Sequence, residues 1–260
     1  MAIFKAYDVR GRYPAEIDED LALRLGYATA RYLKGKRLAV GRDVRTSAPS
    51  IAKAVCEGMS RAGAHVLDLG MCTTPMLYFA VGQYGLDGGV MVTASHNPPE
   101  WIGFKICREK AFPVGERTGL KEIESLAAQP AAAKASGSVE SREVTADYRR
   151  HLRRLLTSVP KLKIVVDTAN GAVGGHFDAI FGDLEPGIRF LRLCFPPDGR
   201  FPNHEPNPLK DENVRDSAAK VVETKADLAV CFDGDGDRCM FLGPDGKRIP
   251  SDLVTVLLAR

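Results

Sequence analysis

The sequence predicts an α/β fold with two consecutive α/β domains, each built on a mixed, mostly parallel sheet covered by helices. Two observations lead to this fold class. Short apolar stretches of strand length alternate with segments of helical periodicity along most of the chain, and strand–helix–strand alternation is typical of parallel sheets covered on both faces. The 260 residues also suffice for two domains, at roughly 100–200 residues each.

The first half of the chain contains three expected strands and three expected helices. The strands are the apolar runs at 37–41, 64–70 and 88–93. The helices are three segments of helical periodicity. The first includes Leu21, Leu25, Ala28 and Tyr32, the second spans 50–61 and the third spans 75–84. Pro75 fits the third helix because proline is tolerated in a first helical turn.

Residues 129–141 interrupt this alternation. The stretch QPAAAKASGSVES is small, polar and without periodicity, so it is expected to be a connection or an exposed loop. After it the alternation resumes. The expected elements are, in order, a helix at 145–156 capped by Thr145, a strand at 161–168, a helix at 171–181, a strand at 188–193, a helix at 209–224 and a strand at 226–232.

The predicted domains span residues 1–142 and 143–242. In the remainder, GPDGK at 243–247 is expected to be a turn between two short strands, with Asp-Gly as its signal. A helix with an apolar face then begins, with Ser251 as its expected cap. This new amphipathic element predicts that 243–260 start a third, absent domain and that the chain is a fragment or a natural short form.

Charge and composition exclude several classes of protein. Lys and Arg number 36 against 33 Asp and Glu, and without a block of basic residues nucleic-acid binding is not expected. There is no apolar core of a signal peptide, and no run approaches the ~18 apolar residues of a membrane span. The six cysteines form no C-x-x-C pair, which indicates that most are buried free thiols in a cytoplasmic protein without membrane contact. Oligomeric state is not predicted.

The stretch CFDGDGDRCM at 231–240 directly follows an expected buried strand. Its Asp233, Asp235 and Asp237 alternate with glycines, which let the backbone curl so that the carboxylates converge. Ligands in open α/β sheets bind beyond the carboxyl ends of the strands. Because carboxylates this close repel one another, a site for a hard cation, Mg²⁺ or Ca²⁺, is expected.

Three alternatives for this acidic stretch fit less well. An EF-hand loop needs a Glu at its twelfth position, where Pro244 stands, and helices on both sides. A phosphatase of the D-x-D-x-T type needs a threonine, which is absent from this stretch. A solvated acidic turn does not account for three acids at a strand end.

Ser95 lies where an expected strand runs into a polar loop, in GGVMVTASHNPPEWIGFKI at 88–106. A phosphoryl group on Ser95 could complete the shell of a metal held by the aspartates. A Ser–His hydrolase is a rival, but no G-x-S-x-G elbow is present, and His96 adjoins Ser95, which seldom lets two side chains face each other. A turn serine without chemistry is the plain alternative.

These stretches together resemble the α-D-phosphohexomutase family, and within it the bacterial phosphomannomutase/phosphoglucomutase branch. The resemblance rests on TASHNPP followed by GFKI, on DGDGDR and on FKAYDVRG near the start. VGRDVRTS, TTPMLYFA and FPNHEPNPL add to it. It covers nearly the whole chain and implies two α/β domains of the phosphohexomutase type.

The resemblance implies a role for each candidate residue. Ser95 would be a phosphoserine, and one of its phosphate oxygens would bind Mg²⁺ together with the three aspartates. Arg10 and Lys105 would flank the phosphoserine. Arg238 would aid phosphoryl transfer or contact the sugar. His96 and Asn97 would belong to the serine loop.

Physical chemistry agrees with two of these roles and leaves alternatives open. Arg10 offers a planar fork to phosphate oxygens. Lys105, close to Mg²⁺ and Arg10, could have a depressed pKa and act as general base. Alternatively, Lys105 is a solvated strand lysine, Arg10 packs between domains and His96 only braces the loop.

The implied reaction is the reversible interconversion of hexose 1-phosphate and hexose 6-phosphate, of mannose or glucose. The enzyme would be an intramolecular phosphotransferase whose partner is a phosphorylated hexose, with glucose 1,6-bisphosphate or mannose 1,6-bisphosphate as activator or intermediate. A metal-dependent sugar phosphatase and a non-catalytic binding or regulatory module of the same fold are the alternatives.

Two departures from the family pattern matter. Trp101 and Ile102 stand before GFK, where the family has a polar pair ending in Asn. The family's G-E-x-S-G-H sugar loop and its C-terminal phosphate-binding loop do not occur. The chain alone is therefore expected to bind Mg²⁺ and carry phosphoserine but to be a poor mutase.

Overall fold

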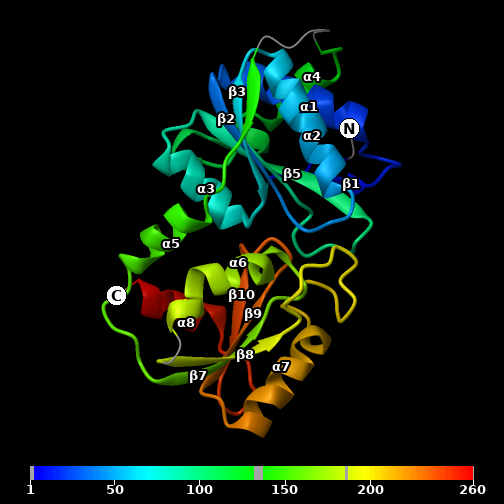
Figure 1. The fold of residues 1–260 in the computed structure, drawn as a ribbon. Helices are drawn as coiled ribbons and strands as arrows, with labels where there is room; N and C mark the ends of the chain where they lie inside the picture. Colours follow the sequence, from blue (N-terminus) through cyan, green and yellow to red (C-terminus); the bar gives the residue numbers. More distant parts are fainter. Residues whose placement is uncertain (1–2, 132–136, 185–186, 260) are drawn as a thin grey trace. The chain divides into compact units, whose positions relative to one another are not determined.

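The computed structural model describes residues 3–131, 137–184 and 187–259 (Figure 1). The chain divides into two compact units. Unit 1 comprises Met1–Ala94 and Pro99–Val144, and unit 2 comprises Ser95–Pro98 and Thr145–Arg260. The short segment Ser95–Pro98 thus groups with unit 2, although the chain on either side of it belongs to unit 1.

Unit 1 is built on a six-stranded sheet with the strand order β1-β5-β4-β2-β3-β6. Strands β4, β2, β3 and β6 run parallel to their neighbours in this group, whereas β5 is antiparallel to both β4 and β1. The mixed, mostly parallel sheet confirms the predicted fold class. The bounds are β1 (Val9–Arg12), β2 (Arg37–Arg42), β3 (His65–Met71), β4 (Gly88–Val92), β5 (Trp101–Arg108) and β6 (Ser138–Ser141).

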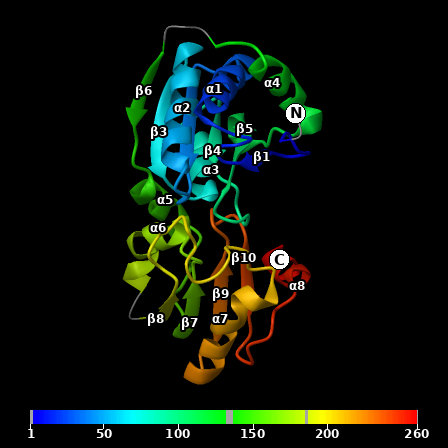
Figure 2. The same cartoon turned by 90° about the vertical axis from the view of Figure 1, so that its right-hand side faces the viewer.

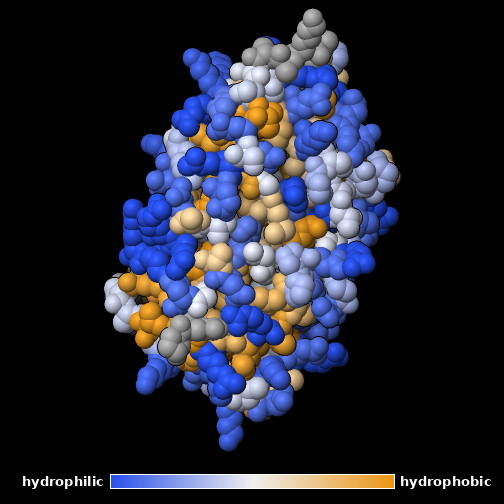
Figure 3. Space-filling view, viewed as in Figure 1, coloured by the Kyte–Doolittle hydropathy of each residue, from blue (hydrophilic) through white to orange (hydrophobic). Residues whose placement is uncertain are grey.

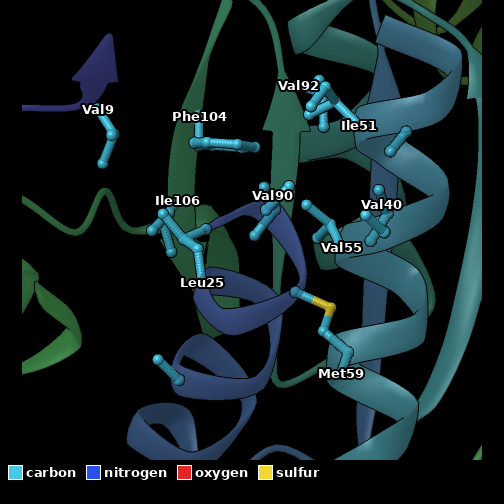
Figure 4. Packing of buried hydrophobic residues seen from close by; sticks show 14 of the residues in the cluster. Val9, Leu25, Val40, Ile51, Val55, Met59, Val90, Val92, Phe104 and Ile106 are labelled. Atoms are coloured by element: carbon cyan, nitrogen blue, oxygen red, sulfur yellow. The ribbon is translucent and has the colours of Figure 1, made fainter. Parts of the chain in front are cut away.

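Helices cover both faces of this sheet because its central strands carry apolar residues on both faces. Val40, Val90 and Val92 belong to one core cluster with residues of α1, α2 and α4 (Figure 4). The alternate residues Gly41 and Met91 point to the other face, as the period of two requires, where α3 packs on β2 and β4. The helices are α1 (Glu19–Leu33), α2 (Ala48–Arg61), α3 (Thr74–Gln83) and α4 (Leu120–Ala127), with short 3₁₀ turns at Glu109–Ala111 and Glu116–Thr118.

The sequence prediction located the central elements of unit 1 and missed its margins. Strands β2, β3 and β4 and helices α1, α2 and α3 lie where expected. Strands β1 and β5 and helix α4 were not predicted. The expected loop at 129–141 is wrong in part, because Ser138–Ser141 forms β6, while 132–136 lie outside the described residues. Strand β6 is an exposed edge strand without an apolar side, so the usual signal of burial is missing.

Unit 2 is built on a smaller sheet with the strand order β10-β9-β7-β8, parallel except for β10 (Figure 2). Val165 packs with residues of α7, and the next residue, Val166, packs with residues of α6. These two helices therefore cover opposite faces. The strands are β7 (Leu162–Asp167), β8 (Ile188–Leu193), β9 (Leu228–Phe232) and β10 (Cys239–Leu242), and the helices are α5 (Thr145–Arg153), α6 (Ala172–Phe181), α7 (Asp211–Thr224) and α8 (Ser251–Leu258), with a 3₁₀ turn at Gly182–Leu184.

Details at the ends of elements differ from the predictions for unit 2. Helix α5 ends at Arg153 rather than at 156. Ser251 is the first residue of α8 and makes no capping bond, since Pro250 occupies the cap position. The turn at 243–247 follows β10, but its second strand is reduced to the single bridge between Leu242 and Arg248.

Helix α8 has an exposed apolar face. Leu253, Val256, Leu257 and Leu258 are 55–81% exposed, and apolar side chains gather over this helix in Figure 3. No helix in the described part of the chain is both long and apolar enough to cross a membrane. The proposal that 243–260 begin a further domain stays a prediction.

The packing of α1 against α2 depends on glycine, and this predicts a stability effect. A Cβ at Gly58 would lie 1.9 Å from Leu23 O, a backbone atom that cannot swing away. We expect Gly58→Ala to lower the free energy of unfolding by about 1–3 kcal/mol. Gly82→Ala adds the same methyl group to α3, where nothing lies within 4 Å, and should raise stability by roughly 0.5–1 kcal/mol. Urea denaturation followed by circular dichroism tests both, and equal stabilities would contradict this account.

Candidate active site

Ser95 lies in the loop between β4 and β5, in a strained and buried position. Its φ angle is +52°, a left-handed conformation that costs a residue with a side chain roughly 1–3 kcal/mol. Its side chain is fully buried, and its Oγ donates a hydrogen bond of 2.6 Å to Asp233 Oδ2. Within unit 2, the hydroxyl that the sequence singled out is therefore held against the first aspartate of the acidic stretch.

His96 lies closer to Ser95 than its adjacency predicts. Its Nδ1 is 3.4 Å from Ser95 Oγ, so the expectation that these two side chains do not face each other is wrong. The left-handed backbone at Ser95 turns the chain enough for the contact. His96 and Asn97 are half-buried, and both belong with Ser95 to the segment that groups with unit 2.

The acidic stretch forms a closed turn between β9 and β10. The Asp233 amide donates to Arg238 O at 3.2 Å, and the Arg238 amide donates to Asp233 Oδ1 at 3.1 Å. Gly236 has a φ of +71°, which glycine adopts at little cost. The turn brings one carboxylate oxygen from each of Asp233, Asp235 and Asp237 within 4.8 Å of the others, as the alternating glycines predict.

Gly234 lets the acidic turn approach the serine loop. A Cβ at this position would lie 2.7 Å from Ser95 O and 3.4 Å from Pro206 Cβ. Gly171, at the start of α6, is similarly close, since its Cβ would lie 2.7 Å from Gly234 O. The Ala172 amide donates to that same oxygen at 2.9 Å. The turn is therefore positioned by backbone contacts that leave no room for a side chain at 234.

The negative charges in this turn favour binding of a cation. Asp233 and Asp235 are fully buried and Asp237 is exposed. Burial raises the pKa of Asp233 well above its usual range, and the negative charges of Asp235 and Asp237 raise it further, against the opposing effect of the Ser95 hydrogen bond. Keeping all three carboxylates ionised is therefore costly without a positive partner. Three hard oxygen donors around one point fit a small divalent cation such as Mg²⁺.

Arg10 and Lys105 lie on the same face of the sheet in unit 1. Arg10 in β1 pairs with Gly103 in β5, and directly paired residues point to the same face. Lys105 follows Gly103 by two positions and therefore lies on that face as well. A Cβ at Gly103 would be 2.2 Å from Val9 O and 3.2 Å from Arg10 Cγ. Glycine thus leaves room for Arg10 to cross the strand.

Arg10 is anchored at the start of the serine loop. Its guanidinium pairs with Asp8 Oδ2 at 2.8 Å, and Nη1 donates to Ala94 O at 3.4 Å. Lys105 is half-buried, and its depressed pKa stays a prediction. In unit 2, Ser95, His96 and the three aspartates lie close together, and Arg238 follows Asp237. In unit 1, Arg10 and Lys105 lie on one face of the sheet.

The sequence prediction missed a buried polar cluster at the end of β7. Asp167 Oδ2 accepts from Ser217 Oγ at 2.9 Å and lies 3.2 Å from His204 Nε2. His204 Nδ1 lies 2.8 Å from Glu205 O. His204 belongs to FPNHEPNPL, a stretch that supported the family resemblance without a role for its histidine. The cluster fixes the loop that carries Pro206, the residue next to Gly234.

Part of this cluster has the composition of a metal site. One possible ligand atom from each of Asp167, Cys194 and His204 lies within 4.8 Å of the other two. Burial alone would lower the pKa of His204. Hydrogen bonds to Asp167 and Cys194, the Asp167 charge and the Glu205 carbonyl outweigh burial and raise the pKa to about 10. A metal ion would have to displace this proton, because it binds neutral imidazole. The cluster is therefore better described as an ion pair that braces a loop.

Comparisons with known proteins identify the family of this chain. The family model described as phosphoglucomutase/phosphomannomutase, alpha/beta/alpha domain I, matches residues 1–134, and that of domain II matches 146–246. A phosphomannomutase of Salmonella montevideo is 40% identical over 268 residues, which cover 100% of this chain and 59% of the relative. A protein of Xanthomonas campestris pv. campestris (strain B100) named "Phosphohexose mutases" is 42% identical over 262 residues, 99% of this chain and 58% of the relative.

A solved structure gives the same result. The crystal structure of a phosphoglucomutase/phosphomannomutase family protein from Burkholderia thailandensis superposes with a TM-score of 0.90 at 34% identity, covering 99% of this chain and 58% of that one. The fold is that of the α/β domains of sugar-phosphate mutases. The chain belongs to the phosphoglucomutase/phosphomannomutase family and spans about 59% of the length of the curated relatives that it matches.

The charge cluster predicts that Mg²⁺ stabilises the protein. At a free Mg²⁺ concentration 100 times its Kd, the free energy of unfolding should rise by about 2.7 kcal/mol relative to EDTA. Asp235→Asn should abolish most of this gain and leave stability in EDTA equal or higher, because it removes one of the repelling charges. Asp216→Asn, on the exposed side of α7, is the matched control and should keep the full gain. An undiminished gain in Asp235→Asn, measured by urea denaturation, would contradict the assignment.

The His204–Asp167 pair predicts a dependence of stability on pH. With a pKa of about 10 when folded and roughly 6.5 when unfolded, His204 contributes stability fully below pH ~6.5, and this contribution is lost as the pH rises to ~10. The stability difference between wild type and His204→Gln should fall by up to about 1.4 kcal/mol per pH unit in this window. His151→Gln, at an exposed position of α5, is the control. A difference that grows with pH would be the wrong sign.

Proposed function

We propose that this chain is the phosphoryl-carrying part of a phosphohexomutase, with Ser95 as the carrier. The observation that carries the proposal is the 2.6 Å hydrogen bond from Ser95 Oγ to Asp233 Oδ2 in a turn of three carboxylates. A serine with no chemical role gains nothing from a strained backbone and a buried acidic neighbour. The family membership and the relatives named phosphomannomutase support the same function.

The reaction would interconvert hexose 1-phosphate and hexose 6-phosphate, of mannose, glucose or both. A sugar hydroxyl oxygen attacks the phosphorus of phosphoserine, the bond from phosphorus to Ser95 Oγ breaks, and a hexose 1,6-bisphosphate forms. Ser95 Oγ then loses its proton and attacks the phosphorus of the other phosphate. The bond from that phosphorus to the sugar oxygen breaks, the sugar oxygen takes up a proton, and phosphoserine and the isomer result. The catalyst must mainly align the oxygens and neutralise charge, because phosphoryl transfer needs little covalent help.

The interaction partner of Asp233 would differ between free serine and phosphoserine. In the free serine, Oδ2 accepts the hydroxyl proton of Ser95. In phosphoserine that proton is gone, so the carboxylate turns from hydrogen-bond acceptor to cation ligand. Asp233, Asp235 and Asp237 with one phosphoserine oxygen would hold Mg²⁺. When bound, the cation supplies positive charge that lowers the cost of charge developing on the transferred group.

The remaining residues would act on the phosphate and the sugar. Arg10 would offer its guanidinium fork to phosphate oxygens. Lys105 would accept the proton of the attacking sugar hydroxyl, which requires a depressed pKa. Arg238 would contact the transferred group or the sugar, while His96 and Asn97 shape the serine loop. We further propose domains at 1–142 and 143–242 and a cytoplasmic location, with weak mutase activity of this chain alone.

The proposal predicts that Ser95 becomes phosphorylated. Incubation with glucose 1,6-bisphosphate and Mg²⁺ should add one phosphoryl group per chain, seen by intact-protein mass spectrometry and mapped to Ser95. Ser95→Ala should stay unmodified, whereas Ser60→Ala, a substitution of a buried serine in α2, should be modified like wild type. Phosphorylation at another residue, or in Ser95→Ala, would contradict the proposal. Release of inorganic phosphate without isomerised sugar would instead indicate a phosphatase.

A further inference from the structure

A fully buried ion pair lies in unit 1 just beyond the end of β2. Asp43 and Arg45 have no exposed side-chain surface, and Arg45 Nε lies 3.1 Å from Asp43 Oδ2. The Arg45 amide donates to Asp43 Oδ1 at 3.0 Å. Burying such a pair removes two charges from water, and apolar residues often stabilise a fold as well. Stabilisation of the fold alone therefore does not explain the pair, and its other hydrogen-bond partners matter.

The two members of the pair bind the two ends of the segment that contains Ser95. On the β4 side, Asp43 Oδ2 accepts from Thr93 Oγ1 at 2.7 Å, and the Asp43 amide donates to Val92 O at 3.0 Å. On the β5 side, Arg45 Nη1 donates to Trp101 O at 2.9 Å. Residues 94–100 lie between these anchors. One rigid pair thus fixes the distance between the last residue of one strand and the first residue of the next.

We propose that Asp43 and Arg45 are positioning residues that set the conformation of the serine loop through Thr93 and Trp101. The inference rests on the proposed function of Ser95. The left-handed backbone at Ser95 persists only if the surrounding structure over-determines it, and fixing both ends of a short loop does so. The fork of arginine matters because Arg45 must bind Asp43 and the Trp101 carbonyl in different directions, which a lysine ammonium on its flexible stem does less well.

Phosphoryl transfer is sensitive to such positioning. A displacement of about 1 Å between reacting atoms can cost roughly 100-fold in rate. A loosened loop should therefore slow the loading of Ser95 before it affects the rest of the fold. Metal binding by the three aspartates should not change, because their turn is held by its own backbone bonds in unit 2.

Thr93→Val tests the inference without leaving a buried charge unpaired. It is nearly isosteric and removes only the hydroxyl that binds Asp43. We expect single-turnover phosphorylation of Ser95 by glucose 1,6-bisphosphate to slow by about 10- to 100-fold, at a temperature where the variant is fully folded. Thr93→Ser, which restores the hydroxyl, should recover the rate to within a few-fold. Thr29→Val is the matched control, because Thr29 Oγ1 is buried without a hydrogen-bond partner among the described residues.

A second readout does not depend on turnover. Amide hydrogen exchange of residues 94–97 should accelerate in Thr93→Val, with α1 and α2 unchanged. A purely structural role would instead lower global stability while the folded protein loads at the wild-type rate. If Thr93→Val loads Ser95 at the wild-type rate and its residues 94–97 exchange as in wild type, this inference is overturned, while the proposed function is unaffected. Failure of the wild-type chain to load Ser95 would overturn the proposed function and this inference with it.

Discussion

Mutual repulsion among three carboxylates in one turn is the constraint on which the candidate site depends. Asp233 and Asp235 are buried, and the pKa of Asp233 is raised by that burial and by its acidic neighbours. The turn is stable in this form only with a proton or a cation, and the hydroxyl of Ser95 already contributes one hydrogen. The repulsion within the turn is therefore the physical basis of the proposed cation site.

Glycine gives this charge cluster its geometry. Gly234 admits the carbonyl oxygen of Ser95, and Gly171 in turn admits the carbonyl of Gly234. Backbone contacts therefore hold the serine and the acids together, and backbone positions vary less than side-chain positions. The ion pair of Asp167 with His204 steadies the loop of Pro206, which lies on the same glycine. In unit 1, the ion pair of Asp43 with Arg45 fixes the residues on both sides of the serine segment.

The sequence predicted what depends on local pattern. Local pattern is strongest in the apolar runs of β2, β4 and β9 and in the D-G-D-G-D repeat. The three strands and the acidic turn were therefore located correctly from the sequence. Strand β6 was missed because an exposed edge strand has no apolar side to reveal it. His204 and Arg45 were missed for another reason: their roles come from contacts with residues far away in the sequence, Asp167 and Trp101. Periodicity and spacing do not encode such contacts.

The proposed function requires that the phosphoryl group on Ser95 and the three aspartates bind one metal ion. Electron–nuclear double resonance of Mn²⁺, substituted for Mg²⁺ in the phosphorylated chain, tests it most directly. We expect a ³¹P hyperfine coupling typical of a directly bound phosphate. This coupling should be absent before phosphorylation and should be lost together with Mn²⁺ binding in Asp235→Asn. Mn²⁺ bound to the aspartates of the phosphorylated chain without any ³¹P coupling would contradict it.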